Sequence, residues 1–234
     1  MTQQALLQAE QLAATGRLAA SIAHEINNPL ESITNLLYLL RREDERKQRE
    51  SYLDLAESEL GRVSEIATNT LRFYRDPVEI TEVHLPGLFH SVLSLFNGHI
   101  STKKIDVRLK LDDVSVTASQ GELRQVLLNL VGNALDAMPK GGRLHIRCRR
   151  FERSVGSRPP GVGICVADTG SGMAPEVLRR IFEPFYTTKG NSGTGLGLWL
   201  SMEILKKHGF RIKVKSKPAS GSNFSLYLPE TNCS

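Results

Sequence analysis

Two long apolar seams near the start of the chain restrict its first part to paired helices. Apolar residues spaced three and four apart recur through residues 3–41, and a second seam runs from Leu53 to Tyr74. This spacing is typical of one face of an α-helix. The seams are Leu18, Ile22, Ile26, Leu30, Ile33, Leu37 and Leu40, and then Leu53, Ala56, Leu60, Val63, Ala67, Thr70 and Tyr74. Because one hairpin leaves part of its stripe uncovered, we expect two hairpins to form a dimeric four-helix bundle.

Asp76-Pro77 marks the expected domain boundary, because the residue before a proline is pushed out of the helical region. We therefore expect a helical hairpin over 1–76 and a second domain over 77–234. Its pattern predicts helices at 88–100, 122–138, 176–182 and 196–208, and strands at 105–111, 143–150, 162–167, 211–217 and 223–228. The expected fold class is α+β, with a mixed sheet covered by helices on one face.

Composition narrows the setting and the partners. Of the 234 residues, 40% are hydrophobic, no apolar run is long enough to span a membrane, and the start lacks the order of a signal peptide. Three widely separated cysteines predict neither disulfides nor a metal site, so we expect a cytoplasmic protein. The net charge of +5 comes from Lys and Arg scattered among acids, and aromatic residues are few. We therefore expect no nucleic-acid partner.

The segment Ser-Ile-Ala-His-Glu-Ile-Asn-Asn-Pro-Leu, residues 21–30, is the first that indicates chemistry. His24 lies two positions from its nearest seam residues, so at about 100° per residue it faces away from the seam. An exposed imidazole can attack phosphorus if a base such as Glu25 takes its second proton. Pro29 cannot donate to the carbonyl of Glu25, which loosens the helix there. The alternative is that His24 and Glu25 are ordinary solvated residues.

A polar face on the expected helix 122–138 indicates a nucleotide site. Ser119 and Glu122 form a capping box at its start, and Asn129, Asn133 and Asp136 follow at spacings of four and three. The buried stripe is Leu123, Val126, Leu127, Leu130 and Ala134. Amide oxygens suit Mg²⁺, which brings phosphates with it. A solvated polar face is the alternative.

Three further segments complete the predicted site. Asp168 ends a strand before Gly170, Gly172 and Met173, and its carboxylate suits the amino group of adenine, although Asp-x-Gly-x-Gly is also a common turn. The segment 182–189 supplies aromatic packing and the cation Lys189. The glycine-rich segment is Gly193, Thr194, Gly195, Leu196 and Gly197, directly before a helix whose N-terminus attracts phosphate. It matches neither the dinucleotide fingerprint nor the P-loop.

The order of these segments resembles the sensor histidine kinases of two-component systems, from about Leu12 to Pro229. Residues 21–30 resemble their phosphoacceptor box and 129–137 their asparagine box. Residues 168–173, 182–189 and 193–198 resemble the first glycine, phenylalanine and second glycine boxes. The His-Glu-x-x-Asn-Pro pattern and the short lid are similar to those of the nitrogen-regulation-like kinases. The resemblance implies a Bergerat-fold ATP-binding domain after the hairpin, shared with type II topoisomerases and chaperone ATPases.

The resemblance also implies a role for each residue. His24 would be the phosphoacceptor, Glu25 the base of autophosphorylation, and Asn28 the residue that orients water during phosphatase action. The partners would be an aspartate of a response regulator and a second copy of the chain. The protein itself would be a soluble kinase or the cytoplasmic part of a longer membrane-bound sensor. The implied ATP-binding residues are Asn129, Asn133, Asp136, Asp168, Gly170, Gly172, Met173, Lys189, Gly193, Thr194, Gly195, Leu196 and Gly197, with Asn133 as the Mg²⁺ ligand and Asp168 as the adenine contact.

Two alternatives stay open. The first is an ATPase of the chaperone type, whose ATP turnover drives a conformational cycle. Those relatives place a glutamate base four residues before the metal asparagine, where this chain has Asn129. Without that base, ATP is expected to wait for a protein nucleophile. The second alternative is a scaffold or a phosphatase without kinase activity, but no expected segment is missing.

Overall fold

A computed structural model describes residues 23, 26–43, 45–75, 79–151, 160–190 and 193–229. The chain separates into two compact units. The first unit is Met1–Asp76 together with Thr188–Thr194, and the second is Pro77–Thr187 together with Gly195–Ser234. The boundary between the two units falls between Asp76 and Pro77. The short segment 188–194 groups with the first unit rather than with its sequence neighbours.

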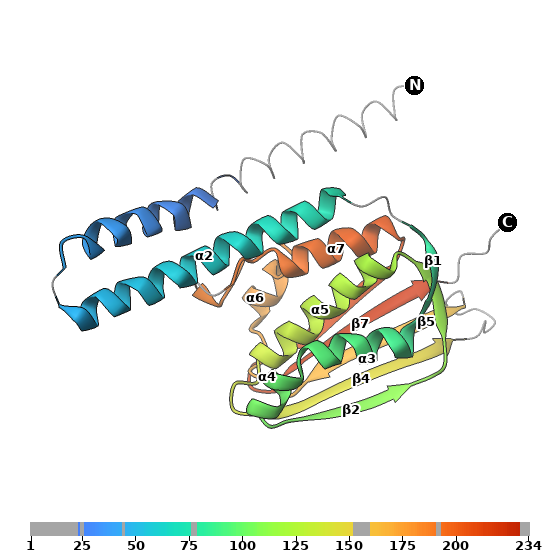
Figure 1. Cartoon of the computed structure of the whole chain (residues 1–234). Helices are drawn as coiled ribbons and strands as arrows, with labels where there is room; N and C mark the ends of the chain where they lie inside the picture. The colour runs from blue at the N-terminus through green and yellow to red at the C-terminus, as the bar shows by residue number, and fades with distance from the viewer. Residues whose placement is uncertain are drawn as a thin grey trace, which may run out of the picture. The chain divides into compact units, whose positions relative to one another are not determined.

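The first unit contains an antiparallel pair of helices (Figure 1). Residues 26–40 are helical, and α2 (Arg46–Arg75) follows after a short turn. The guanidinium of Arg49 holds this turn together by donating to the carbonyl oxygens of Leu40 at 3.2 Å and Glu43 at 3.0 Å. The helix α2 ends one residue before Asp76, whereas residues 3–22 of the expected first helix lie outside the described residues.

The predicted seams of the hairpin are only partly covered in a single chain. Ala56 is buried, but Leu30, Leu37, Leu53 and Leu60 keep between 42% and 51% of their surface exposed. Ile66 is buried although it does not belong to the predicted seam. An apolar stripe therefore remains on the surface of the hairpin.

The second unit is built on a mixed five-stranded sheet. Its strands are β2 (Ile105–Leu111), β4 (Gly142–Phe151), β5 (Gly161–Asp168), β6 (Arg211–Ser216) and β7 (Ser222–Pro229). They lie in the order β2-β4-β5-β7-β6, with β2 parallel to β4 and all other pairs antiparallel. A separate antiparallel pair joins β1 (Thr81–His84) to β3 (Ser115–Ala118).

Helices cover one face of this sheet. The helices are α3 (Leu85–Leu95), α4 (Asn97–Thr102), α5 (Gln120–Asp136), α6 (Pro175–Arg180) and α7 (Gly197–Lys207). Of these, α3, α5 and α7 lie side by side, with α5 in the middle (Figure 1). Side chains that alternate along the strands fill the core beneath them, including Leu144, Ile146, Val162, Ile164, Val166, Phe224 and Leu226. The α+β expectation is confirmed.

Some expected elements differ from the structure. The single helix expected at 88–100 is two helices, because the backbone leaves the helical region at Phe96, with φ −103° and ψ 5°. The first of them starts three residues early, where the His84 side chain accepts a hydrogen bond from the Gly87 amide at 3.3 Å. Strands β1 and β3 were not predicted, because each has four residues and is too short for a clear alternation. No helix within the described ranges combines the length and apolar character that a membrane span requires.

Candidate functional site

The polar face of α5 lies opposite a fully buried stripe, as predicted. All five residues of the expected stripe are buried, and Val131 and Leu135 join them. Asn129 and Asn133 are half-buried, while Asp136 at the end of the helix is exposed. The Asp136 carboxylate lies 3.6 Å from the Lys103 ammonium, which also donates to the carbonyl oxygen of Leu135 at 3.0 Å. Lys103 therefore stabilises the C-terminal end of α5.

The side chain of Asn129 links α5 to α7. Its amide nitrogen donates to the carbonyl oxygen of Gly197 at 2.8 Å and to the Ser201 hydroxyl oxygen at 3.1 Å. Its amide oxygen accepts from Gln125 at 3.1 Å. The Ser201 hydroxyl in turn donates to the Gly197 carbonyl at 2.9 Å. Asn129 is thus a positioning residue for the start of α7.

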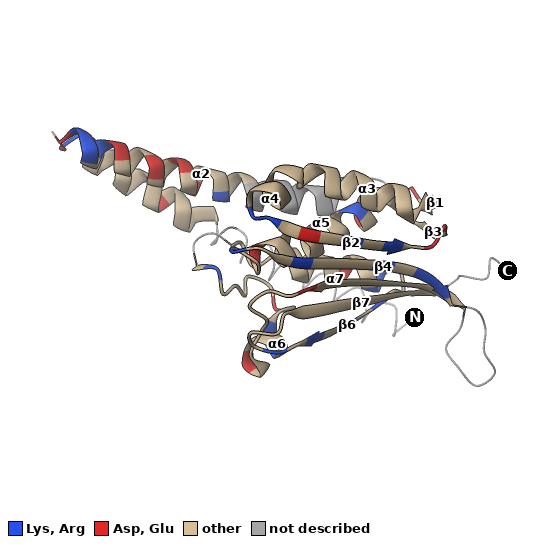
Figure 2. Cartoon of the chain, turned by 90° about the horizontal axis from the view of Figure 1, so that it is seen from below, with Lys and Arg blue, Asp and Glu red and all other residues tan. Residues whose placement is uncertain are grey.

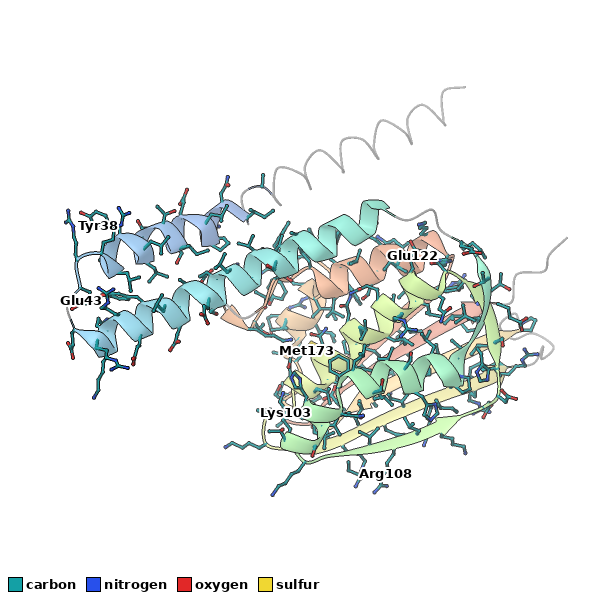
Figure 3. All side chains as sticks on the ribbon, in the orientation of Figure 1. Tyr38, Glu43, Lys103, Arg108, Glu122 and Met173 are labelled. Carbon is teal, nitrogen blue, oxygen red and sulfur yellow. The ribbon has the colours of Figure 1, made fainter. Side chains whose placement is uncertain are left out.

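A second link between these helices lies at the N-terminal end of α5, where Figure 3 labels Glu122. Ser119 caps α5 by accepting from the Glu122 amide at 3.4 Å, as the expected capping box requires. The Glu122 carboxylate, however, binds the end of α7, at 2.6 Å from both the Lys207 ammonium and the His208 ring nitrogen. The capping box is therefore only half formed, because a tertiary contact takes the glutamate.

Asp168 is a buried carboxylate at the end of β5. It is 7% exposed, and its Oδ1 accepts hydrogen bonds from the backbone amides of Gly170 at 2.8 Å and Ser222 at 3.3 Å. Burial raises the pKa of Asp168 above its ordinary value, and these amides partly oppose that rise. Gly221 makes this arrangement possible, since a side chain there would collide with the Asp168 carbonyl. A carboxylate held in this way is a fixed acceptor rather than a mobile surface charge.

The two predicted glycines after Asp168 have clear structural reasons. Gly170 lies so close to the end of α5 that a Cβ would overlap the Ala137 backbone, and the Ser171 amide donates to the Ala137 carbonyl at 3.0 Å. Gly172 has φ +64°, and a Cβ there would collide with the carbonyl of Lys217. These contacts bring the Asp168 turn against the end of α5 that carries Asn133 and Asp136. The predicted residues of α5 and of this turn therefore form one cluster.

Met173 closes this turn. Its amide donates to the Ser216 hydroxyl at 2.8 Å, and its half-buried side chain packs against the core. Figure 3 shows Met173 at the opposite end of α5 from Glu122. The side chain thus adds an apolar surface to the turn that follows Asp168.

The second glycine segment leads directly into α7. Gly195 has φ +66°, and a side chain there would collide with the backbone of Phe185, so the phenylalanine segment and the glycine segment are in contact. Leu196 is buried and precedes the first residue of α7. No side chain caps this helix, in contrast to α5. The first turn of α7 is therefore suited to a phosphate group.

Several predicted residues are not part of this cluster. His24 and Glu25 lie outside the described residues. Asn28 is exposed on the first helix, and Lys189, Gly193 and Thr194 belong to the segment that groups with the first unit. The cluster is therefore built from the second unit: Asn129, Asn133, Asp136, Asp168, Gly170, Gly172, Met173, Gly195, Leu196 and Gly197.

The residues that support this cluster were not predicted from the sequence. Ser201 is fully buried and lies four residues after Gly197, a spacing that places both on one side of α7. Ser222 and Gly221 support Asp168 from another part of the chain, so no local pattern could identify them.

Two family models match the chain in series. Residues 14–77 match the His Kinase A (phospho-acceptor) domain, and residues 118–232 match the histidine kinase-, DNA gyrase B-, and HSP90-like ATPase. The first range contains His24, and the second contains the cluster around Asp168.

The chain belongs to the histidine kinase family. Residues 118–232 accordingly form an ATP-binding domain of this family. The prediction of a histidine kinase with a hairpin followed by a Bergerat-type domain is confirmed. Membership of the nitrogen-regulation-like subgroup stays a prediction.

Similar proteins include other kinases of this family. Sporulation kinase A of Bacillus subtilis is 35% identical over 98% of this chain and 37% of its own length. The catalytic domain of histidine kinase ThkA is 32% identical, with a TM-score of 0.57 over 65% of this chain and 98% of that one. ThkA in complex with response regulator protein TrrA is 28% identical, with a TM-score of 0.74 over 95% of this chain and 64% of that one. Four curated relatives are matched over only 30% to 50% of their length.

Proposed function

We propose that this histidine kinase uses ATP to phosphorylate His24 and then transfers the phosphoryl group to an aspartate of a response regulator. The observation that carries the proposal is the order of the two family domains, a phosphoacceptor domain that contains His24 and then an ATPase domain. The solved complex of the similar kinase ThkA with its response regulator supports this class of partner.

Recognition of ATP rests on the cluster in the second unit. The fixed carboxylate of Asp168 would accept a hydrogen bond from the amino group of adenine, which guanine replaces with an oxygen. The uncapped first turn of α7 would bind a phosphate through its backbone amides. Met173 would pack against the base. These three features fit a nucleotide that lies between the Asp168 turn and α7.

Mg²⁺ fits the donors present in this region. Asn133 offers an amide oxygen, one turn after Asn129 and one turn before Asp136 on the same face of α5. Mg²⁺ prefers oxygen ligands and usually retains water and phosphate ligands, so one protein oxygen is sufficient. Bound there, the ion would neutralise charge on the phosphates, while Asn133 would hold the nucleotide in register.

The proposed reaction is an in-line displacement at the γ-phosphorus. A ring nitrogen of His24 forms the new N–P bond, the bond between phosphorus and the bridging oxygen breaks, and ADP leaves. Glu25 takes the proton that the imidazole loses. Positioning of ATP by the second unit supplies most of the rate enhancement. In the second step the phosphoryl group passes from His24 to a carboxylate of the partner.

A neutral amide at position 129 supports a kinase over an ATP-hydrolysing machine. The side-chain amide of Asn129 is not a base, so it cannot remove a proton from water as a glutamate could. Its nitrogen donates to Gly197 and Ser201 instead. ATP would therefore persist until His24 reaches it.

We propose that the hairpin forms a homodimer as a four-helix bundle. The exposed leucines of its two seams, at positions 30, 37, 53 and 60, support this assembly because a second hairpin would bury them.

Asn28, four residues after His24 in the sequence, would orient the water that removes phosphate from the response regulator when the kinase acts as a phosphatase.

The test is incubation of the protein with γ-labelled ATP. Label that is acid-labile, stable to alkali, absent in His24→Gln and retained in the matched control His99→Gln is the expected result. His99 is an exposed histidine of the second unit, so its replacement controls for the change of residue type. Steady ATP hydrolysis without labelled protein would instead favour the chaperone-type function.

A mixed dimer tests whether His24 is phosphorylated within one protomer or by the other protomer. Chains with His24→Gln and chains with Asn133→Ala are combined, so that only one chain of each dimer can accept and only the other can bind ATP correctly. Labelled protein in the mixture shows transfer between protomers. Labelling only after reassembly with wild-type chains shows transfer within one protomer.

A further inference from the structure

The face of the sheet that no helix covers is strongly basic. Eight Lys and Arg side chains project from it, two on β2, three on β4 and three on β6. They are Arg108, Lys110, Arg143, Arg147, Arg149, Arg211, Lys213 and Lys215, and all are exposed. Figure 2 shows this distribution as blue segments on β2, β4 and β6, whereas β7 has none.

These cations form two rows with a neutral strip between them. Strands β5 and β7 lie between β4 and β6, and their residues on this face are small or uncharged: Gly163, Cys165, Ala167, Asn223, Ser225 and Tyr227. Three strand spacings of about 4.8 Å separate β4 from β6, so the rows are about 14 Å apart. Long side chains therefore flank a shallow trough that runs along the strands.

The strand register aligns the cations across the trough. Arg149 and Arg211 face each other across Gly163 and Tyr227. In the next line Arg147 lies opposite Lys213, with Lys110 beside Arg147. In the third line the β4 position is His145, so Lys215 of β6 lies opposite Arg108 of β2, four strand spacings or about 19 Å away. Successive lines are two residues apart along the strands, or about 6.7 Å.

Little negative charge balances this face. Asp106 is the only carboxylate that the described strands direct to it, and it pairs with Arg108 at 2.9 Å and Arg143 at 3.2 Å. Lys213, Lys215 and Arg211 have no carboxylate within ion-pair distance among the residues that the structure describes. His145 lies in the same field, and its pKa is lowered by burial and by the charges of Arg147, Arg108 and Arg143.

We propose that this trough is a docking surface for an acidic α-helix of a partner protein. A helix is about 10–12 Å across and fits between rows about 14 Å apart. Carboxylates four residues apart on a helix are separated by about 6 Å, close to the spacing of the three lines of cations. Two acids on each flank of such a helix would therefore meet the lines of Arg149 with Arg211 and of Arg147 with Lys213. A third acid on one flank would meet Lys215, and a third on the other flank would reach towards Arg108.

The composition of the trough favours a protein helix over other polyanions. Binding of single-stranded nucleic acid needs aromatic platforms for its bases, but the strip offers Tyr227, which is nearly buried, and the Phe151 ring, which covers Gly163 at one end. A flat anionic membrane would touch the tips of the two rows and leave the polar strip between them without partners. Neither a nucleic acid nor a membrane would therefore contact the strip between the two rows as a helix would.

The binding test uses two acidic helical peptides of identical composition, labelled for fluorescence anisotropy, and the full chain. In the first peptide three glutamates at i, i+4 and i+8 are joined by three at i+1, i+5 and i+9, so the flanks lie about 100° apart. In the second peptide the second set is moved by one residue, which places the flanks about 200° apart. We expect the first peptide to bind at least fivefold more tightly, with an affinity that falls as salt rises.

Charge-reversal variants test each row. Lys213→Glu/Lys215→Glu and Arg147→Glu/Arg149→Glu should each weaken the first peptide at least tenfold. The matched control Arg41→Glu/Lys47→Glu makes the same change of charge on the exposed end of the hairpin and should change the affinity less than twofold. Circular dichroism verifies folding, and Lys213→Gln/Lys215→Gln replaces the first variant if that one does not fold.

Three outcomes would overturn the proposal. Equal affinity of the two peptides would show that the trough does not select a helix. If the hairpin control loses as much affinity for the first peptide as the row variants do, the binding depends only on the net charge of the chain. Tighter binding of phosphatidylserine vesicles or of a single-stranded oligonucleotide than of the first peptide would assign the surface to a membrane or to nucleic acid.

Discussion

Asn129 and Gly197 are joined by a hydrogen bond of 2.8 Å between the side-chain amide nitrogen and the backbone carbonyl oxygen. The bond fixes the first turn of α7, where a phosphate is expected, against the helix that carries the proposed Mg²⁺ ligand Asn133. The two sides of the proposed nucleotide site are therefore held together by the protein's own contacts.

Replacing Asn129 by aspartate should destabilise the second unit. The new carboxylate would place an oxygen beside the Gly197 carbonyl oxygen, with no donor between them. Loss of a part-buried hydrogen bond of this kind costs about 1–3 kcal/mol, measurable by urea unfolding. Ser201→Ala, which removes the neighbouring hydroxyl, should cost less because the amide of Asn129 still donates to Gly197. An Asn129→Asp protein of unchanged stability would contradict this account.

Asp168→Asn should raise stability while it weakens ATP binding. Burial raises the pKa of Asp168, so the ionised carboxylate is less favourable in the folded than in the unfolded protein. The cost is absent below the unfolded pKa, where both states are protonated, and complete above the raised folded pKa. The thermal midpoint of Asp168→Asn should therefore exceed that of the wild type increasingly as pH rises through this window. Calorimetry at several pH values and ATP titration measure the two effects. A gap that narrows towards neutral pH would refute the assignment.

Glu122→Gln should weaken the contact between the N-terminal end of α5 and the C-terminal end of α7. Its carboxylate is the shared partner of Lys207 and His208, each at 2.6 Å, and the His208 side chain is only 8% exposed. We expect a loss of about 1–2 kcal/mol in the free energy of unfolding. The matched control is Glu203→Gln, since Glu203 pairs with Lys206 on the surface, and its cost should stay within about 0.5 kcal/mol. Similar losses in both variants would contradict the prediction.

Alanine substitutions at two glycines of left-handed conformation should differ in cost. Gly209 has φ +67° and open space around it, so Gly209→Ala should cost about 1–2 kcal/mol of backbone strain. Gly172 has φ +64° and faces the Lys217 carbonyl, so Gly172→Ala should cost about 1–3 kcal/mol more. Chemical denaturation gives both values. ATP affinity should fall only for Gly172→Ala, because that turn carries Asp168.

Charge on the hairpin stripe should prevent dimer formation. The double variant Leu53→Glu/Leu60→Glu places carboxylates where the proposed four-helix bundle buries leucines, and it should sediment as a monomer. Leu95→Glu is the control, since Leu95 is 66% exposed at the end of α3 in the other unit. The control should remain a dimer. A dimeric double variant would require a different interface.

Local patterns predicted most of the elements and the order of the site segments. The spacing of apolar residues identified both hairpin helices and the buried stripe of α5, because side-chain burial repeats with the period of the helix. The same patterns failed at Phe96, where one expected helix is two, and at the short strands β1 and β3. Elements of four residues are too short for a repeat to be visible.

The sequence by itself determined the family and the two-part organisation, and it predicted the residues expected to surround the nucleotide. These features are carried by residues that are neighbours in the chain. Only the tertiary structure decided that Glu122 binds the end of α7, that Asn129 is bonded to Gly197, and that Ser222 supports Asp168. It also gathered cations that are scattered along the sequence into two rows on one face of the sheet. The physical reason is register, because only the pairing of strands and the packing of α5 on α7 define which distant residues meet.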